Sequence, residues 1–115
     1  MVPVHEFGII EDIYNSKIGI EYEPVKYDCI SVDDEIINTI YERLLIVKTF
    51  FHSLDRPEFG LAYSGITIIP PESLSLFYYV VISLNLYENS LELYELAQKI
   101  KEAYEGRKYM IHYGI

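Results

Sequence analysis

Three histidines are the residues of this 115-residue chain best suited to metal binding or proton transfer. His5 and His112 stand in apolar segments near the two ends of the sequence. Adjacent strands could bring them together as metal ligands or as an acid–base pair. A metal site needs further ligands, and the sequence has no H-x-x-x-H pair and no Cys/His cluster. We therefore expect two separate, half-buried strand histidines and no metal site.

The remaining nucleophile candidates lack the surroundings that activate a nucleophile. Cys29 stands in an apolar segment predicted as a strand, where burial raises the pKa of a thiol and leaves it inert. Ser64 is not in a G-x-S-x-G elbow, because position 62 is alanine. His52 is expected at a helix C-terminus, where a cation is favoured. The sequence has no glycine-rich phosphate loop, so we expect no catalytic residue, no cofactor and no enzyme.

Four carboxylates between Asp28 and Glu35 form the densest acidic cluster, which also includes Asp33 and Asp34. The cluster lacks the spacing and the central glycine of a calcium loop. It falls where a strand is expected to pass into a helix, and acids are favoured in a first helical turn. We therefore interpret it as a helix cap and not as a metal site.

The net charge is the strongest indication of a partner. Nine basic and eighteen acidic residues give a formal net charge of −9. A phosphate backbone would be repelled, so nucleic acid is not expected as a partner. The field would attract a basic protein, although the charge could equally serve solubility alone. The candidate contact residues are exposed acids: Glu11, Asp12, Glu21, Glu23, Asp33, Asp34 and Glu35.

The compartment is predicted from what the chain lacks. A single cysteine cannot form an internal disulfide, and no basic segment followed by an apolar core opens the sequence. The longest apolar run, residues 76–82, is far shorter than the roughly 20 residues of a spanning helix. A cytoplasmic protein without a membrane segment is therefore expected.

Hydrophobic periodicity predicts five strands and two helices in one domain, residues 1–115. Apolar side chains stepping by three and four predict helices, and alternating or continuous short apolar runs predict strands. Residues 11–24 are expected to form a loop or an irregular hairpin. The expected strands are residues 4–10, 27–32, 59–69, 76–84 and 108–113, and the expected helices are residues 33–52 and 89–106.

This order places one strand before a ferredoxin-like βαββαβ unit. The expected fold is α+β, with a mostly antiparallel sheet and two helices on one face. The segment 76–84 is expected to be the central strand, because both of its faces are apolar.

A family resemblance adds a function. The opening His5-Glu6-Phe7-Gly8-Ile9-Ile10, the two helices between strands and the closing Tyr113-Gly114-Ile115 resemble small immunity proteins of bacterial polymorphic-toxin systems. The resemblance implies a compact acidic inhibitor that blocks a basic toxin or effector domain. Two alternatives remain open: a small-molecule-binding regulatory domain, and a homo-oligomeric structural protein with a ferredoxin-like sheet, for which a homodimer is the simplest form.

Overall fold

The computed structural model describes residues 3–13, 22–83 and 87–115. These residues form an α+β fold with a six-stranded antiparallel sheet and three α-helices. The strands are β1 (Val4–Ile10), β2 (Ile30–Asp33), β3 (Lys48–Phe51), β4 (Pro57–Phe59), β5 (Ile66–Ile69) and β6 (Tyr109–Tyr113). The helices are α1 (Asp34–Ile40), α2 (Leu74–Ile82) and α3 (Leu91–Gly106), with short 3-10 turns η1 (Arg43–Ile46), η2 (Pro71–Ser73) and η3 (Tyr87–Asn89).

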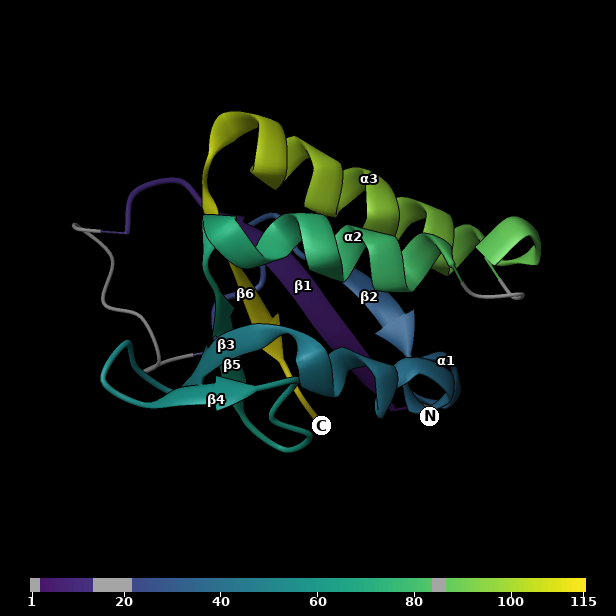
Figure 1. Cartoon of the computed structure of the whole chain (residues 1–115), viewed down its shortest axis with the longest axis horizontal. Helices are drawn as coiled ribbons and strands as arrows, with labels where there is room; N and C mark the ends of the chain where they lie inside the picture. Colours follow the sequence, from purple (N-terminus) through teal and green to yellow (C-terminus); the bar gives the residue numbers. More distant parts are fainter. Residues whose placement is uncertain (1–2, 14–21, 84–86) are drawn as a thin grey trace.

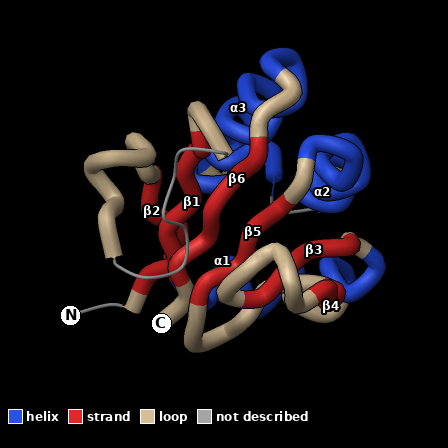
Figure 2. The backbone as a smooth tube through the Cα atoms, turned by 90° about the vertical axis from the view of Figure 1, so that its left-hand side faces the viewer, coloured by secondary structure: helices blue, strands red, loops and turns tan. Residues whose placement is uncertain are grey.

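The strand order across the sheet is β2-β1-β6-β5-β3-β4. Strand β6 therefore lies between β1 and β5, and Figure 2 shows these three strands side by side. In this register His112 is opposite Phe7 of β1 on one side and Thr67 of β5 on the other. Residues from both ends of the sequence thus meet at the centre of the sheet.

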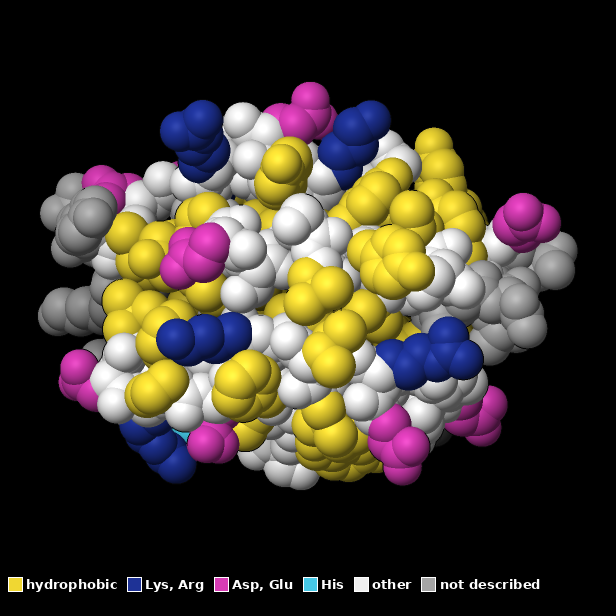
Figure 3. Space-filling model, viewed as in Figure 1, with side chains coloured by type: hydrophobic (Ala, Val, Ile, Leu, Met, Phe, Trp, Pro, Cys, Tyr) yellow, Lys and Arg dark blue, Asp and Glu magenta, His cyan; other side chains and the backbone are white. Residues whose placement is uncertain are grey.

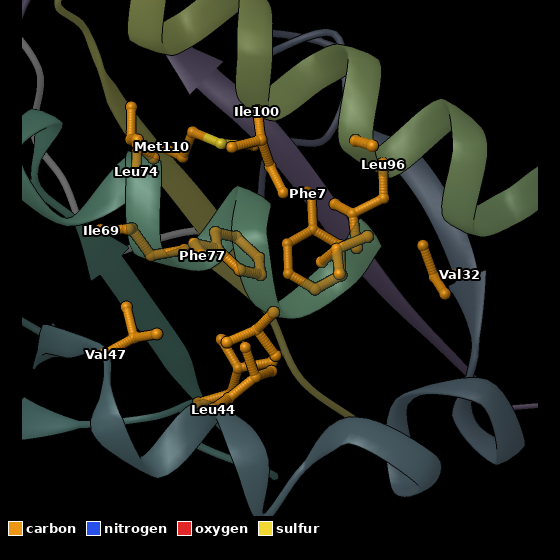
Figure 4. Close-up of a cluster of buried hydrophobic side chains, with 14 of the residues drawn as sticks. Phe7, Val32, Leu44, Val47, Ile69, Leu74, Phe77, Leu96, Ile100 and Met110 are labelled. Atoms are coloured by element: carbon orange, nitrogen blue, oxygen red, sulfur yellow. The ribbon is translucent and has the colours of Figure 1, made fainter. Parts of the chain in front are cut away.

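One hydrophobic core fills the space between the sheet and the helices. Figure 1 shows α2 and α3 running side by side across the sheet, with α1 near the end of β2. Phe7 of β1 and Phe77 of α2 meet in this core with a ring-centroid distance of 6.0 Å, and Figure 4 shows Leu44 below them. Helix α3 contributes its inward side, including Leu96 and Ile100, both fully buried.

Several expectations from the sequence are confirmed. Strand β1 spans residues 4–10 as expected, and β6 and α3 lie within one or two residues of their expected bounds. Asp33 caps α1, because its side chain accepts a hydrogen bond from the amide of Glu35. The cap of α3 is Ser90, which accepts from the Leu93 amide, and not Asn89, where the helix was expected to begin. The α+β class is therefore correct.

The expected central strand at residues 76–84 is wrong, because residues 74–82 form helix α2. The run is apolar on all sides, so it shows neither a period of 3.6 nor a period of 2. Phe77, Val80 and Val81 are buried in the core, whereas Leu76 and Tyr79 are exposed. The apolar residues on the exposed side hid the helical periodicity.

The expected helix over residues 33–52 is also wrong beyond its first two turns. Helix α1 ends at Ile40, η1 follows, and residues 48–51 form strand β3. The expected strand at 59–69 is divided into β4 and β5, and the strand expected at 27–32 begins only at Ile30. The ferredoxin-like order with two helices is therefore not confirmed.

Within the described residues, no helix is long and apolar enough to cross a membrane.

Candidate functional site

The structure brings His5 and His112 together and buries both fully, so the expectation of two separate, half-buried histidines is wrong. Side chains alternate between the two faces of a strand. His5 therefore shares the helix-facing side of β1 with Phe7, and His112 shares that side of β6 with Met110. Thr67 of β5 lies on the same side, directly opposite His112. The three polar side chains continue the hydrophobic core toward α1.

A continuous row of hydrogen bonds links these residues to helix α1. The Nδ1 atom of His5 lies 2.8 Å from Nε2 of His112, and the two rings stack at 5.1 Å. The Nε2 atom of His5 lies 2.9 Å from Oδ1 of Asp34. At the other end, Nδ1 of His112 lies 3.1 Å from Oγ1 of Thr67, which accepts from the Ala62 amide at 2.8 Å. We call Asp34, His5, His112 and Thr67 the histidine row.

One assignment of protons satisfies every bond in the row while both rings are neutral. The Asp34 carboxylate can only accept, so His5 donates from Nε2 and accepts at Nδ1. His112 then donates from Nε2 and accepts at Nδ1 from the hydroxyl of Thr67. Thr67 is free to donate because its oxygen already accepts from the Ala62 amide. All the donors point the same way, toward Asp34.

The electrostatics of the row follow from burial and from these bonds. Burial lowers the pKa of His112 well below 6.5, and the neighbouring His5 lowers it further. The hydrogen bond from His5 is the main cause that lowers the pKa of Asp34. Tyr63 donates to the other oxygen of Asp34 at 2.9 Å, and this bond raises the pKa of Tyr63. The row therefore links a charged carboxylate at Asp34 to a neutral imidazole at His112.

Access limits the chemistry that this row can perform. His5, Thr67 and His112 are all fully buried, so no substrate can touch them in this conformation. The row meets solvent at Asp34, whose side chain is 14% exposed, and at Tyr63, which is 38% exposed. Among the described residues, no group of three His, Cys, Asp or Glu side chains could hold a metal ion. The buried row can therefore take up or release protons and can connect α1 to the sheet.

The acidic residues predicted to contact a partner do not form one patch. Glu11 pairs with Lys108 and follows one end of β1, whereas Asp33 lies opposite Val4 at its other end, with Asp34 next to it at the start of α1. Glu23 pairs with Lys26 at 3.5 Å. Glu35 is exposed in the first turn of α1, Asp12 is exposed next to Glu11, and Glu21 lies outside the described residues.

Two other sequence candidates lie outside the expected elements. Cys29 precedes β2 instead of standing within a strand, and it is partly buried. The pKa of its thiol is raised to about 12, chiefly by burial. His52 is exposed in the turn after β3, with φ at 67°, so it does not cap a helix. Asp28, also in a turn, pairs with Lys99 at 3.1 Å.

Helix α2 presents an unusual outer side. None of its nine residues is charged, yet Leu76, Tyr79 and Ile82 are exposed by 37%, 62% and 36%. Figure 3 shows hydrophobic side chains gathered over α2 and continuing over η1, where Leu45 and Ile46 are exposed. We call the exposed residues of α2, namely Ser75, Leu76, Tyr79 and Ile82, together with the exposed C-cap Ser83, the outer α2 surface.

A cleft of about 410 Å³ borders the outer α2 surface. It lies between α2 and α3 and is lined by Ser75, Tyr78, Lys101, Tyr104 and Glu105. Tyr87 of η3 and Tyr94 of α3 lie near Tyr78, toward the other end of α2. Tyrosines therefore follow the boundary between α2 and α3 along much of its length.

The sequence did not indicate Thr67, Tyr63 or the outer α2 surface. A signal for Thr67 existed, since it is a polar residue at an inward position between apolar ones in Ile66-Thr67-Ile68-Ile69.

A comparison of the chain with protein-family models, with curated proteins and with solved structures finds no match.

Proposed function

We propose that this chain is a non-catalytic protein-binding module, and that a basic partner protein docks on the outer α2 surface. The observation that carries the proposal is the absence of charge on a helix whose outward side is exposed. A surface helix normally carries polar residues outward. Leu76, Tyr79 and Ile82 instead form an apolar patch of the kind that marks interaction sites on monomeric proteins.

Tyrosine suits the centre of such an interface. Its ring supplies a large rigid contact area and its hydroxyl keeps a polar contact, so tyrosine is enriched among residues that dominate binding energy. Tyr79 is the most exposed residue of the patch, and Tyr78 and Tyr104 line the adjoining cleft. A partner side chain entering the cleft would therefore meet aromatic rings on both α2 and α3.

The charge around this surface specifies the partner. Residues 61–98, which include α2 and half of α3, contain four acids and no lysine or arginine. Glu88 and Glu95 are exposed in η3 and α3. A basic partner would be steered toward the chain by its net charge of −9. At the cleft it would meet Glu105 beside Lys101.

The resemblance to immunity proteins gives the biological setting of the proposal. There the partner is a basic toxin or effector domain, and docking occludes its active site in the cytoplasm. The acids named from the sequence then act through the long-range field, since Glu11, Glu23 and Asp34 already have partners within the chain. The burial of His5 and His112 supports a non-catalytic role.

The test is native mass spectrometry of the untagged protein isolated from its own cells at low salt. We expect a stoichiometric complex with a polypeptide richer in Lys and Arg than in Asp and Glu, dissociating as salt rises. Tyr79→Lys should abolish the complex. Phe59→Lys is the matched control, because Phe59 is 58% exposed on β4 and the change adds the same charge.

Other outcomes reassign the surface. A bare monomer in the wild type and in both variants would refute the proposal. A homodimer that Tyr79→Lys dissociates would make the outer α2 surface a self-association face. A bound small molecule would favour the second candidate, a small-molecule-binding regulatory domain, for which the 410 Å³ cleft is the specific observation.

A further inference from the structure

We propose that the histidine row is an acid-sensitive clasp, which holds α1 and the loop 61–65 onto the sheet while both imidazoles are neutral and opens when the pair takes up protons. The inference does not depend on the proposed partner. It rests on the number of protons that the geometry between His5 and His112 can hold.

The gap between the rings accommodates one proton. The Nδ1 atom of His5 and the Nε2 atom of His112 are 2.8 Å apart, so one nitrogen must donate and the other must accept. Protonation of both rings would point two N–H groups at each other between two cations. That arrangement has no hydrogen bond and a large repulsion in a buried site.

A single added proton already disturbs the row. A proton on Nδ1 of His5 obliges His112 to accept at Nε2 and to carry its own proton on Nδ1. His112 then donates to Thr67, whose hydroxyl loses its acceptor. A buried hydroxyl without an acceptor is costly, so acid weakens the row from its far end.

The one charged group that faces the two imidazoles among the described residues, Asp34, lies on the His5 side of the pair. Asp34 of α1 is hydrogen-bonded to His5, and Tyr63 of the loop 61–65 packs edge-on against His5 at 5.5 Å. His112 is faced by the hydroxyl of Thr67 from β5 and by the ring of Phe7 from β1, 4.8 Å away. Helix α2, which packs against this core, has no charged residue.

The row joins α1 and the loop 61–65 to the sheet. Asp34 holds the loop 61–65 through the hydroxyl of Tyr63, and Thr67 holds it through the amide of Ala62. The backbone carbonyls of Tyr63 and Gly65 in turn accept from the amides of residues 115 and 114. Loss of the row therefore loosens the start of α1, the loop and the end of β6 together.

The test compares two histidine substitutions. The amide of His112→Gln can donate to His5 but does not titrate, whereas His52→Gln removes an exposed histidine outside the row. For the wild type and for His52→Gln, we expect the unfolding equilibrium constant to rise about tenfold per pH unit for each proton taken up, beginning below pH 6.5. For His112→Gln, this rise should shrink by one proton. Equal slopes in all three proteins would overturn the clasp.

A measurement on the wild type alone keeps the test decisive if His112→Gln fails to fold. Hydrogen exchange followed by NMR reports the amide of Ala62, which is bonded to Thr67. We expect its protection factor to fall at least tenfold between pH 7.5 and pH 5, while amides in the middle of α3 keep theirs. Constant protection of Ala62 as His112 titrates would contradict the proposal.

Discussion

The imidazoles of His5 and His112 are separated by 107 positions in the sequence and by 2.8 Å in space. A contact between residues so far apart in the sequence cannot form within a single helix or hairpin. The contact exists because β6 inserts between β1 and β5, which places both rings on the helix-facing side of the sheet. The pair is therefore a sensitive reporter of the complete fold.

His112 is expected to be neutral at pH 7.5, and both rings are expected to carry a proton on Nε2. This tautomer is the one that lets His5 donate to Asp34 and His112 donate to His5. Long-range ¹H–¹⁵N correlation spectra distinguish the two nitrogens of each ring. A proton on Nδ1 of His112 at this pH would contradict the direction assigned to the row.

Thr67→Val should destabilise the protein although the two side chains are similar in volume. Valine cannot bond to the Ala62 amide or to His112, and each buried group left without a partner costs about 1–3 kcal/mol. Urea denaturation at pH 7.5 measures the change. Thr39→Val is the control, because Thr39 is exposed in α1 and should change stability by about 0.5 kcal/mol or less.

Asp34→Asn should lower the pKa of Tyr63. The carboxylate of Asp34 accepts a hydrogen bond from the Tyr63 hydroxyl and raises the pKa of Tyr63 above 10. Removing the charge of Asp34 therefore makes deprotonation of the phenol easier. Titration of the assigned Tyr63 ring carbons by ¹³C NMR reports the shift. Asp33→Asn serves as the control, since Asp33 caps α1 and is not bonded to Tyr63. An unchanged pKa of Tyr63 in Asp34→Asn would show that Tyr63 is not hydrogen-bonded to Asp34.

Phe77 and Tyr79 offer a direct test of the helical state of α2. Two residues apart, they would share one face of a strand, but in the helix Phe77 is buried and Tyr79 is 62% exposed. Phe77→Ala should therefore cost about 3–5 kcal/mol of unfolding free energy. Tyr79→Ala should cost about 0.5 kcal/mol, as for surface positions. Similar costs for the two substitutions in urea denaturation would argue against the helix.

Local sequence patterns predicted the strands and helices whose hydrophobic pattern is clear within the segment itself. Strand β1 is a short, mostly apolar run that ends before Glu11, and α3 has an inward stripe that includes Leu93 and Ile100. The α+β class followed from these elements. The N-terminal cap formed by Asp33 was also predictable, because short acids before an apolar stripe favour a helix start.

Tertiary context decided the rest of the fold. Helix α2 was mistaken for a strand because its outward residues Leu76 and Tyr79 are apolar, which conceals a period of 3.6. Strand β3 was mistaken for helix because Val47 and Phe51 continue the stripe of α1 at helical spacing. Pairing with β4 and β5 overrides that spacing.

The candidate site was only partly predictable. The sequence placed His5 and His112 in the first and last strands, so their meeting was one of the stated alternatives. It gave no reason to add Thr67 or Tyr63, because their contacts depend on which strands are neighbours in the sheet. The exposure of α2 likewise depends on which layer the helix occupies.

The position of β6 also affects how the protein is made. Ribosomes release residues in order, so β1, β2, β3, β4 and β5 leave the tunnel before residues 109–113 do. The strand pairs β1–β2 and β3–β5 then have no shared neighbour until β6 arrives and bonds to both β1 and β5. The whole sheet can therefore assemble only after its central strand β6 has been synthesised. A nascent chain that still lacks β6 exposes the unpaired edges of β1 and β5 to chaperones.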